Sequence, residues 1–233
     1  MPDSEHIQRW FRTVQKYKAI YSEMSSEDPF DELTPFEHRR LGRRLENNRD
    51  FEAALLHYRA CLKKGVPENE LPHLHVRLAQ VSAKNNDPES ALHHYQQALT
   101  LGLSNSTVHA GLARNLYLLQ GEPDRIRAHL EKALELDQSY AVAHDWFSTF
   151  LKEIGEVDEA ERHSRAAVSL SRERRRQPNA VFLNNLALVL VERGDKESLE
   201  EAEQLLEEAV ECSSPGFDYP KLNLQKVQRL LQR

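Results

Sequence analysis

The chain has 233 residues, of which 29% are charged and 39% hydrophobic, and its formal net charge is -6. An acidic chain lacks the basic surface that general nucleic-acid binding needs, because such binding displaces counterions from phosphates. With only 8 glycines and 10 prolines, the composition is typical of a soluble, helix-rich protein.

The two cysteines, Cys61 and Cys212, lie far apart and outside any CxxC motif. They predict neither a disulfide framework nor a zinc site, and they suit a reducing compartment, so we expect a cytoplasmic protein. No apolar run approaches the roughly 20 residues that span a bilayer. The polar, acidic N-terminus does not resemble a secretory signal. We therefore expect no membrane insertion.

The first predicted element is a helix over residues 4–24. One of its faces carries apolar residues at spacings of three and four, namely Trp10, Val14, Tyr17 and Tyr21. Two roles remain open for this helix: it covers the exposed edge of the element that follows, or it docks into another chain. The acidic segment Ser25–Glu32 predicts a linker, so residues 1–34 form an N-terminal helix and linker.

The segment from Pro35 to about Glu68 predicts two helices joined by a short turn. Thr34 can cap the first helix, and Glu37 can reach back to complete a capping box. The turn falls at residues 47–49, and Asp50 begins the second helix. An apolar stripe at helical spacing follows: Ala54, Leu55, Tyr58, Cys61 and Leu62. Gly65 ends the second helix.

This pair of helices is repeated along the chain. Residues 46–65 and 84–102 share identical residues at a distance of 37 positions, among them Ala54 with Ala91, Leu55 with Leu92, His57 with His94, Tyr58 with Tyr95, and Gly65 with Gly102. Later small residues continue the series at steps of 35, 34 and 42: Ala98, Ala133, Ala167 and Ala209. We predict five repeats within residues 35–216, at about 35–68, 72–105, 106–140, 141–174 and 180–216.

Small residues recur at fixed places, where two helices must approach closely. They follow a leucine at Leu41-Gly42, Leu78-Ala79, Leu112-Ala113 and Leu186-Ala187, and they return in the second helices, as at Ala54, Ala91 and Ala98. From Pro35 to Pro215 this pattern resembles the tetratricopeptide repeat (TPR) family, whose period is 34 residues. Ile126 and Ser148 depart from the pattern, one extra residue falls near Arg114, and the fifth repeat has three extra residues. The resemblance implies an all-α fold, a right-handed α-solenoid of about five helix-turn-helix repeats with N- and C-terminal flanking helices.

The last predicted element is a basic amphipathic helix from Asp218 to Arg233. Its apolar face carries Leu224, Val227, Leu230 and Leu231. We expect residues 217–233 to seal the last repeat, because the ends of repeat arrays need covering. A membrane-surface role is less favoured, because the helix is short and has little bulky apolar surface to insert.

Catalytic and cofactor motifs are missing from the sequence. It has no phosphate-binding GxxxxGK, no GxGxxG, no HExxH and no GxSxG. Adjacent His93 and His94 point apart on a helix and cannot share a metal. His57 and His94 hold the same place in two repeats, which favours packing or a chance surface position over catalysis. Cys61 falls where a small core residue is expected. The basic run Ser171–Arg176 is interpreted as a solvated helix end, and a nucleic-acid site is the less favoured alternative. We therefore predict no enzyme activity, cofactor or metal.

In the family that the chain resembles, the first helix of each repeat lines a concave groove that binds peptides. We take as candidate partner-binding residues those opposite the packed faces of these helices: Arg39, Arg43, His73, Arg77, Gln80, Arg114, Tyr117, Asn184 and Asn185. Guanidinium groups pair with carboxylates, and Asn can hold a peptide backbone. This predicts an acidic peptide or partner surface as ligand. The alternative, that the arginines pair with nearby acids, stays open.

The leading hypothesis is thus a non-enzymatic protein-interaction module, of the adaptor kind. The second is a self-assembling scaffold, a homo-oligomer in which the N-terminal helix docks into a neighbour. RNA binding by a helical-repeat array is a third hypothesis, which the acidic net charge disfavours.

Overall fold

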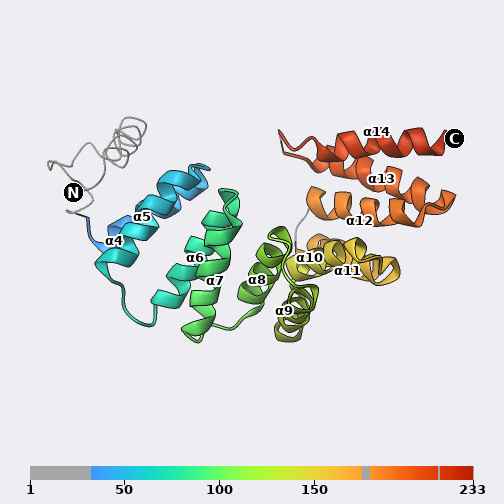
Figure 1. Ribbon diagram of the computed structural model, residues 1–233. Coiled ribbons are helices and arrows are strands. Elements are labelled where there is room, and N and C mark those ends of the chain that lie inside the picture. The colour runs from blue at the N-terminus through green and yellow to red at the C-terminus, as the bar shows by residue number, and fades with distance from the viewer. Residues whose placement is uncertain (1–32, 175–178, 215, 233) are drawn as a thin grey trace. The chain divides into compact units, whose positions relative to one another are not determined.

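The computed structural model describes residues 33–174, 179–214 and 216–232 (Figure 1). The predicted N-terminal helix and linker, and the end of the basic run at residues 171–176, lie outside them. The described residues form eleven α-helices and no strand, so the predicted all-α fold is confirmed. They fall into an N-terminal unit that ends at Leu101 and a C-terminal unit that begins at Gly102, and each is described by itself.

The N-terminal unit holds two helix pairs: α4 (Pro35–Asn47) with α5 (Phe51–Lys64), and α6 (Leu71–Lys84) with α7 (Pro88–Thr100). The C-terminal unit holds three pairs and one further helix. The pairs are α8 (Ser106–Leu118) with α9 (Pro123–Leu136), α10 (Ala141–Glu153) with α11 (Val157–Arg174), and α12 (Ala180–Arg193) with α13 (Lys196–Cys212). The last helix is α14 (Tyr219–Leu231). We call the five pairs repeats one to five.

The helix ends follow from local sequence. Thr34 Oγ1 accepts a hydrogen bond from the Glu37 amide at 3.3 Å, and the Thr34 amide donates to Glu37 Oε2 at 2.8 Å, so the predicted capping box is confirmed. Asp50 caps α5 by accepting from the Ala53 amide at 3.2 Å. Gly65 follows α5 with a φ of 88°, a conformation that glycine adopts without strain.

The turn inside every repeat contains one residue with positive φ. These residues stand eight positions after the leucine or phenylalanine of the small-residue motif: Arg49, Asn86, Gln120, Gly155 and Gly194. The extra residue of repeat three therefore lies in the turn, at Gly121, and not near Arg114. In repeat five the three extra residues fall between Asp195, which caps α13, and Ala202, so that they lengthen the start of α13 by about one turn.

Close approach of paired helices explains the small residues. A Cβ atom added to Gly42 would lie 2.9 Å from Cε1 of Tyr58, which is fully buried on the partner helix. Ala54, Ala91 and Ala98 are likewise fully buried. Cys61 is buried too, and its thiol donates to the Pro35 carbonyl at 3.2 Å. The prediction of a core thiol is confirmed.

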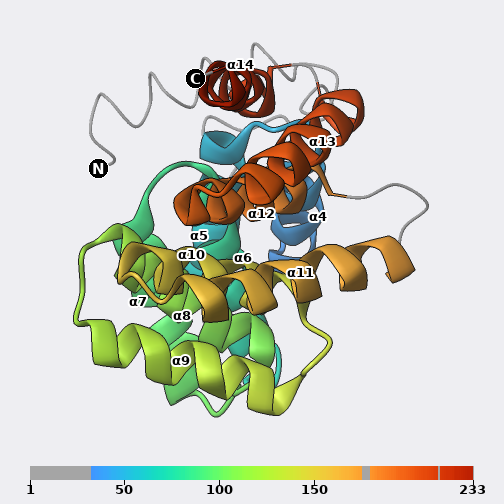
Figure 2. The same cartoon turned by 90° about the vertical axis from the view of Figure 1, so that its right-hand side faces the viewer.

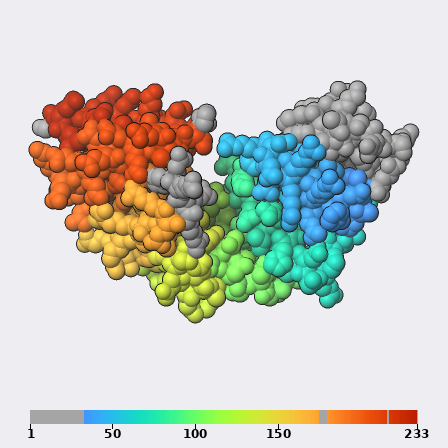
Figure 3. Space-filling view, turned by 180° about the vertical axis from the view of Figure 1, so that it is seen from behind, coloured from blue at the N-terminus to red at the C-terminus, as the bar shows by residue number. Residues whose placement is uncertain are grey.

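The C-terminal helix α14 packs on α13. Val227 belongs to the apolar cluster that contains Leu183, Leu186 and Leu206, and Leu224 and Leu231 pack against the same cluster. Figures 1 and 2 show α14 lying along the outer side of α13, and the space-filling view shows α12 to α14 as one packed body (Figure 3). α14 thus covers apolar surface of repeat five that would otherwise face water.

Candidate partner-binding surfaces

In the N-terminal unit, ion pairs link the first helix of repeat one to repeat two. Arg39 of α4 pairs with Glu70, which directly precedes α6. Glu46 of α4 receives Lys84 Nζ at 2.8 Å and Arg77 Nη1 at 3.7 Å, both from α6. Two of the candidate binding residues, Arg39 and Arg77, are therefore paired with acids of their own unit.

Glu46 is the centre of this contact. Its side chain is only 8% exposed, and Tyr58 donates its hydroxyl hydrogen to Glu46 Oε2 at 3.3 Å. Burial, with a further contribution from the Glu46 carboxylate, raises the pKa of Tyr58 well above its usual range. Glu46 thus holds together side chains from three helices. The sequence offered no signal for this role, because Glu46 stands in a helix that is otherwise rich in exposed charge.

The other candidates of this unit remain open to solvent. Arg43 and His73 are exposed and Gln80 is half-buried, and none of them has a hydrogen-bond or ion-pair partner within the described residues. Arg40 and Arg44 are exposed beside Arg43 on α4. Residues 33–101 contain ten Lys and Arg against eight Asp and Glu, a formal charge of +2. The N-terminal unit therefore presents a basic surface centred on α4.

In the C-terminal unit, Arg114 and Tyr117 of α8 meet an aromatic side chain of α10. The Arg114 guanidinium lies 5.3 Å from the Trp146 ring centre, and the Tyr117 ring lies 6.1 Å from it. Burial, with Glu153, raises the pKa of Tyr117. The sequence analysis missed Trp146. Aligning the repeats would have identified it, because Trp146 holds the place of the candidates Arg77 and Asn185.

Asn184 and Asn185 lie in a chain of side-chain hydrogen bonds that crosses three helices. Asn223 of α14 donates to Asn184 Oδ1 at 2.8 Å, Asn184 donates to Asn185 Oδ1 at 3.3 Å, and Asn185 donates to Asp145 Oδ1 at 2.9 Å. Asn184 is buried and Asn185 is half-buried. Burial raises the pKa of Asp145 to about 6, although the bond from Asn185 acts in the opposite direction. The structure thus uses both amides to join α10, α12 and α14.

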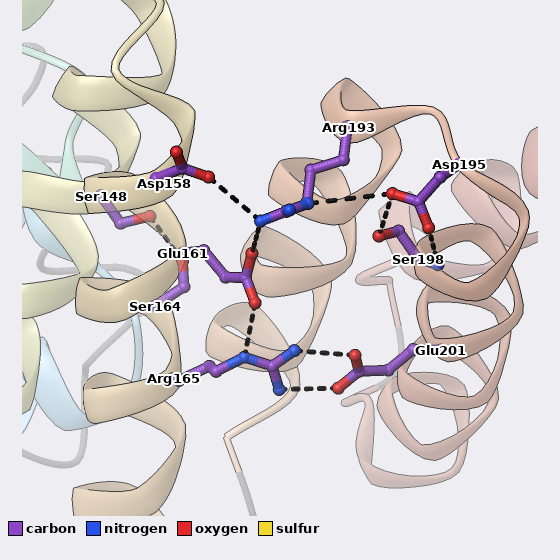
Figure 4. Close-up of polar contacts among 9 residues, drawn as sticks. All are labelled: Ser148, Asp158, Glu161, Ser164, Arg165, Arg193, Asp195, Ser198 and Glu201. Carbon is purple, nitrogen blue, oxygen red and sulfur yellow. Dashed lines mark hydrogen bonds and ion pairs between the residues drawn. The ribbon is translucent and has the colours of Figure 1, made fainter.

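A second polar network joins the later helices of this unit (Figure 4). Arg165 of α11 makes two hydrogen bonds of 2.7 Å with Glu201 of α13, and it also contacts Glu161 at 2.8 Å. Arg193, at the end of α12, lies 2.7 Å from Glu161 and 3.1 Å from Asp158. Both arginines of this network are paired with its carboxylates, so it offers no positive charge to an acidic ligand. Glu201 of α13 thus takes part in this network. Glu203, also on α13, accepts a hydrogen bond from Gln228 of α14 at 3.0 Å.

The described residues contain no group of three or more His, Cys, Asp or Glu side chains that could hold a metal ion. Among the same residues, no helix is both long enough and apolar enough to cross a membrane.

Comparisons with known proteins bear on the fold. No family model and no curated protein matches the chain. TTC0263, a thermophilic TPR protein of Thermus thermophilus, is similar in structure with a TM-score of 0.67 at 19% identity, over 84% of this chain and 100% of that one. YrrB, a TPR protein with an unusual peptide-binding site, has a TM-score of 0.52 at 19% identity, over 94% and 99%. The Cut9-Hcn1 hetero-tetramer of the APC/C contains a chain with a TM-score of 0.67 at 14% identity, over 98% and 48%.

The helix pairs, their small-residue contacts and these neighbours define a protein of the helical-repeat class. Within that class the chain has the TPR fold, as the sequence pattern predicted.

Proposed function

We propose that this protein is a non-enzymatic interaction module that binds a peptide or an acidic partner surface along the first helices of its repeats. The observation that carries the proposal is the exposed arginine row on α4, Arg40, Arg43 and Arg44, which makes no ion pair within the described residues. Neighbouring Arg39 and Arg77 are paired with Glu70 and Glu46, and Glu46 also pairs with Lys84. The exposed row therefore carries the positive charge of α4 that is not paired with an acid among the described residues.

The chemistry of these side chains favours carboxylates. A guanidinium offers a planar set of donors that matches a carboxylate with two parallel bonds. Arg114 over Trp146, with Tyr117 beside it, adds a second candidate surface in the C-terminal unit. Arg, Trp and Tyr are the residues most enriched among those that dominate binding energy at protein interfaces. The two free cysteines, of which Cys61 is buried, fit a cytoplasmic location.

The test is capture of partners from a source-cell lysate at several salt concentrations, with identification by mass spectrometry. We compare the wild type with Arg40→Glu/Arg43→Glu. The matched control is Arg59→Glu/Lys63→Glu, which makes the same charge change at exposed positions of α5. We expect a protein that the wild type and the control retain, that the α4 variant loses, and whose retention falls with salt. Equal capture by all three proteins would refute the role of the α4 arginines.

A second candidate function is self-assembly, and the charge distribution favours it. The described residues from Gly102 onward contain fourteen Lys and Arg against twenty-two Asp and Glu, a formal charge of -8, whereas residues 33–101 carry +2. Exposed Glu207 and Glu211 of α13 have no partner among the described residues. One copy would then offer its acidic α13 to the basic α4 of another. Light scattering over a concentration series tests this: growth in mass should disappear in Arg40→Glu/Arg43→Glu and return when Glu207→Lys/Glu211→Lys is mixed with it.

A further inference from the structure

Eight of the eleven histidines form four pairs, one in each of the first four repeats. Every pair joins the first helix of its repeat to the second through the two Nδ1 atoms. The distances are 3.0 Å for His38 and His57, 3.1 Å for His75 and His94, 3.0 Å for His109 and His129, and 2.8 Å for His144 and His163. The same contact at four equivalent places is a property of the repeat and not of one locality.

Repeat five provides a comparison within the chain. Its equivalent positions, three before Leu186 and three after Ala202, hold Leu183 and Leu205. Both leucines are buried in the apolar cluster of that repeat, at 0% and 9% exposure. The same place between two helices is therefore filled either by two imidazoles or by two leucines. The fold does not require histidine there, so the consequences of the histidine pair lie in its chemistry.

A bond between two Nδ1 atoms requires one proton between them. In repeat four, His144 Nε2 lies 3.1 Å from the Gln138 carbonyl and donates to it, so a neutral His144 has a bare Nδ1 that accepts from His163. A first added proton can bind Nε2 of His163 and leave this bond intact. A second must bind Nδ1 of His144, where it breaks the bond and places two cations in contact.

The surroundings oppose the charged forms. His38 and His57 are fully buried. Burial lowers the pKa of His57 to about 3 and that of His94 and His163 to about 4, and the partner histidine adds to each shift. Burial also lowers the pKa of His75, His109 and His129.

Burial remains the largest cause of each lowered histidine pKa, and the charged neighbours of the pairs contribute less. Cations face the pairs from several helices: Arg59 and His93 near His94, Lys132 near His109, Arg125 near His129, and Arg162 near His163. Carboxylates act in the opposite direction at three of the pairs: Glu37 near His38, Asp87 beside His94 and Glu135 beside His109. In repeat four, Glu131 and Glu135 of α9 line a hollow next to His144. Glu161, two residues before His163 in the sequence, pairs with Arg165 and Arg193.

We propose that the four histidine pairs make the packing of repeats one to four acid-sensitive, because the second proton on a pair breaks the contact between its two helices, whereas repeat five, with Leu183 and Leu205, does not respond. The proposal is independent of the partner. It predicts that mild acid loosens the array repeat by repeat and spares α12 to α14.

The direction in pH follows from proton linkage. A histidine whose pKa is lower in the folded chain than its usual value near 6.5 binds more protons when unfolded, so stability is full above about pH 6.5 and falls as the pH drops toward about 4.

The first experiment is an acid titration of the full chain by circular dichroism. The variant His144→Leu/His163→Leu copies repeat five into repeat four, and exposed His73→Leu is the control for loss of a histidine. We expect the midpoint of acid unfolding to move down by about 0.3–0.5 pH unit in the double variant and to stay at the wild-type value in the control. The reverse variant, Leu183→His/Leu205→His, should raise the midpoint. Unchanged midpoints in both double variants would overturn the proposal.

A second measurement needs no core variant. ¹⁵N NMR of the histidine side chains reports the protonation of each ring in the wild type. The exposed His73 serves as the reference ring, and each pair should take up its second proton only together with loss of native signals. Eight paired rings that titrate singly and near pH 6.5 in the folded protein would refute the inference, whatever the variants do.

Discussion

Repeats one to four and repeat five solve the same packing problem with opposite chemistry. At one contact between paired helices, the first four repeats place two histidines within 3.1 Å, and the fifth places Leu183 and Leu205. A leucine contact depends only on apolar area removed from water. A histidine contact also depends on a shared proton, so its contribution changes with pH. The comparison shows that one repeat fold can carry two different responses to its environment.

The largest expected effect concerns the small residue at the close contact between paired helices, a feature that all the repeats share. Gly42→Leu places a side chain where even a Cβ would lie 2.9 Å from the Tyr58 ring. We expect a loss of about 3 kcal/mol of unfolding free energy, measured by urea denaturation, because neither helix can yield without losing its own contacts. The corresponding change in repeat five is Ala187→Leu, and we expect a similar loss there. A much smaller effect at Gly42 would mean that repeat one is loosely packed and differs from repeat five in more than its histidines.

The next largest effect distinguishes a histidine pair from a leucine pair at the same helix contact. His75→Leu leaves Nδ1 of the half-buried His94 facing an apolar side chain, and we expect a cost of about 1–2 kcal/mol near pH 7.5. Adding His94→Leu creates the contact of repeat five, so the double variant should be more stable than the single one. Denaturation of both variants forms a double-mutant cycle. Additive losses would show that the two rings do not interact.

Asp145 should change stability with pH in the direction opposite to the histidine pairs. Its pKa is raised to about 6 by burial, so its charged form destabilises the folded chain, and stability rises as the pH falls from about 6 toward 4. Asp145→Asn keeps an acceptor for Asn185 and removes the charge. We expect a gain of about 1 kcal/mol in unfolding free energy at pH 7.5 and no gain near pH 4. Thermal unfolding at the two pH values measures this difference. A loss at pH 7.5 would show that the carboxylate is needed by the chain of amides.

The smallest effect is expected on the exposed basic row. Arg40→Glu/Arg43→Glu should change stability by no more than about 0.5 kcal/mol, because both side chains are exposed and make no ion pair within the described residues. Thermal unfolding beside Arg59→Glu/Lys63→Glu checks this. A large loss in the α4 variant alone would assign the row to the fold and would remove it as a binding surface.

The repeated residues by themselves determined the fold of the described helices. Ala54, Ala91 and Gly42 mark close helix contacts, Thr34 and Asp50 mark helix starts, and these local rules act within a few residues. For the same reason the core position of Cys61 was predictable from its place in the repeat.

Only the tertiary structure decided which polar groups meet. The sequence placed His57 and His94 at equivalent positions, but their partners His38 and His75 stand 19 residues earlier, and the contact exists only because two helices fold against each other. The same holds for Arg77 with Glu46 and for Asn185 with Asp145, which are paired inside the protein, while Arg43 is left exposed. Apolar periodicity specifies a face of one helix; the neutralisation of a charge depends on distances between helices, which a one-dimensional pattern does not contain.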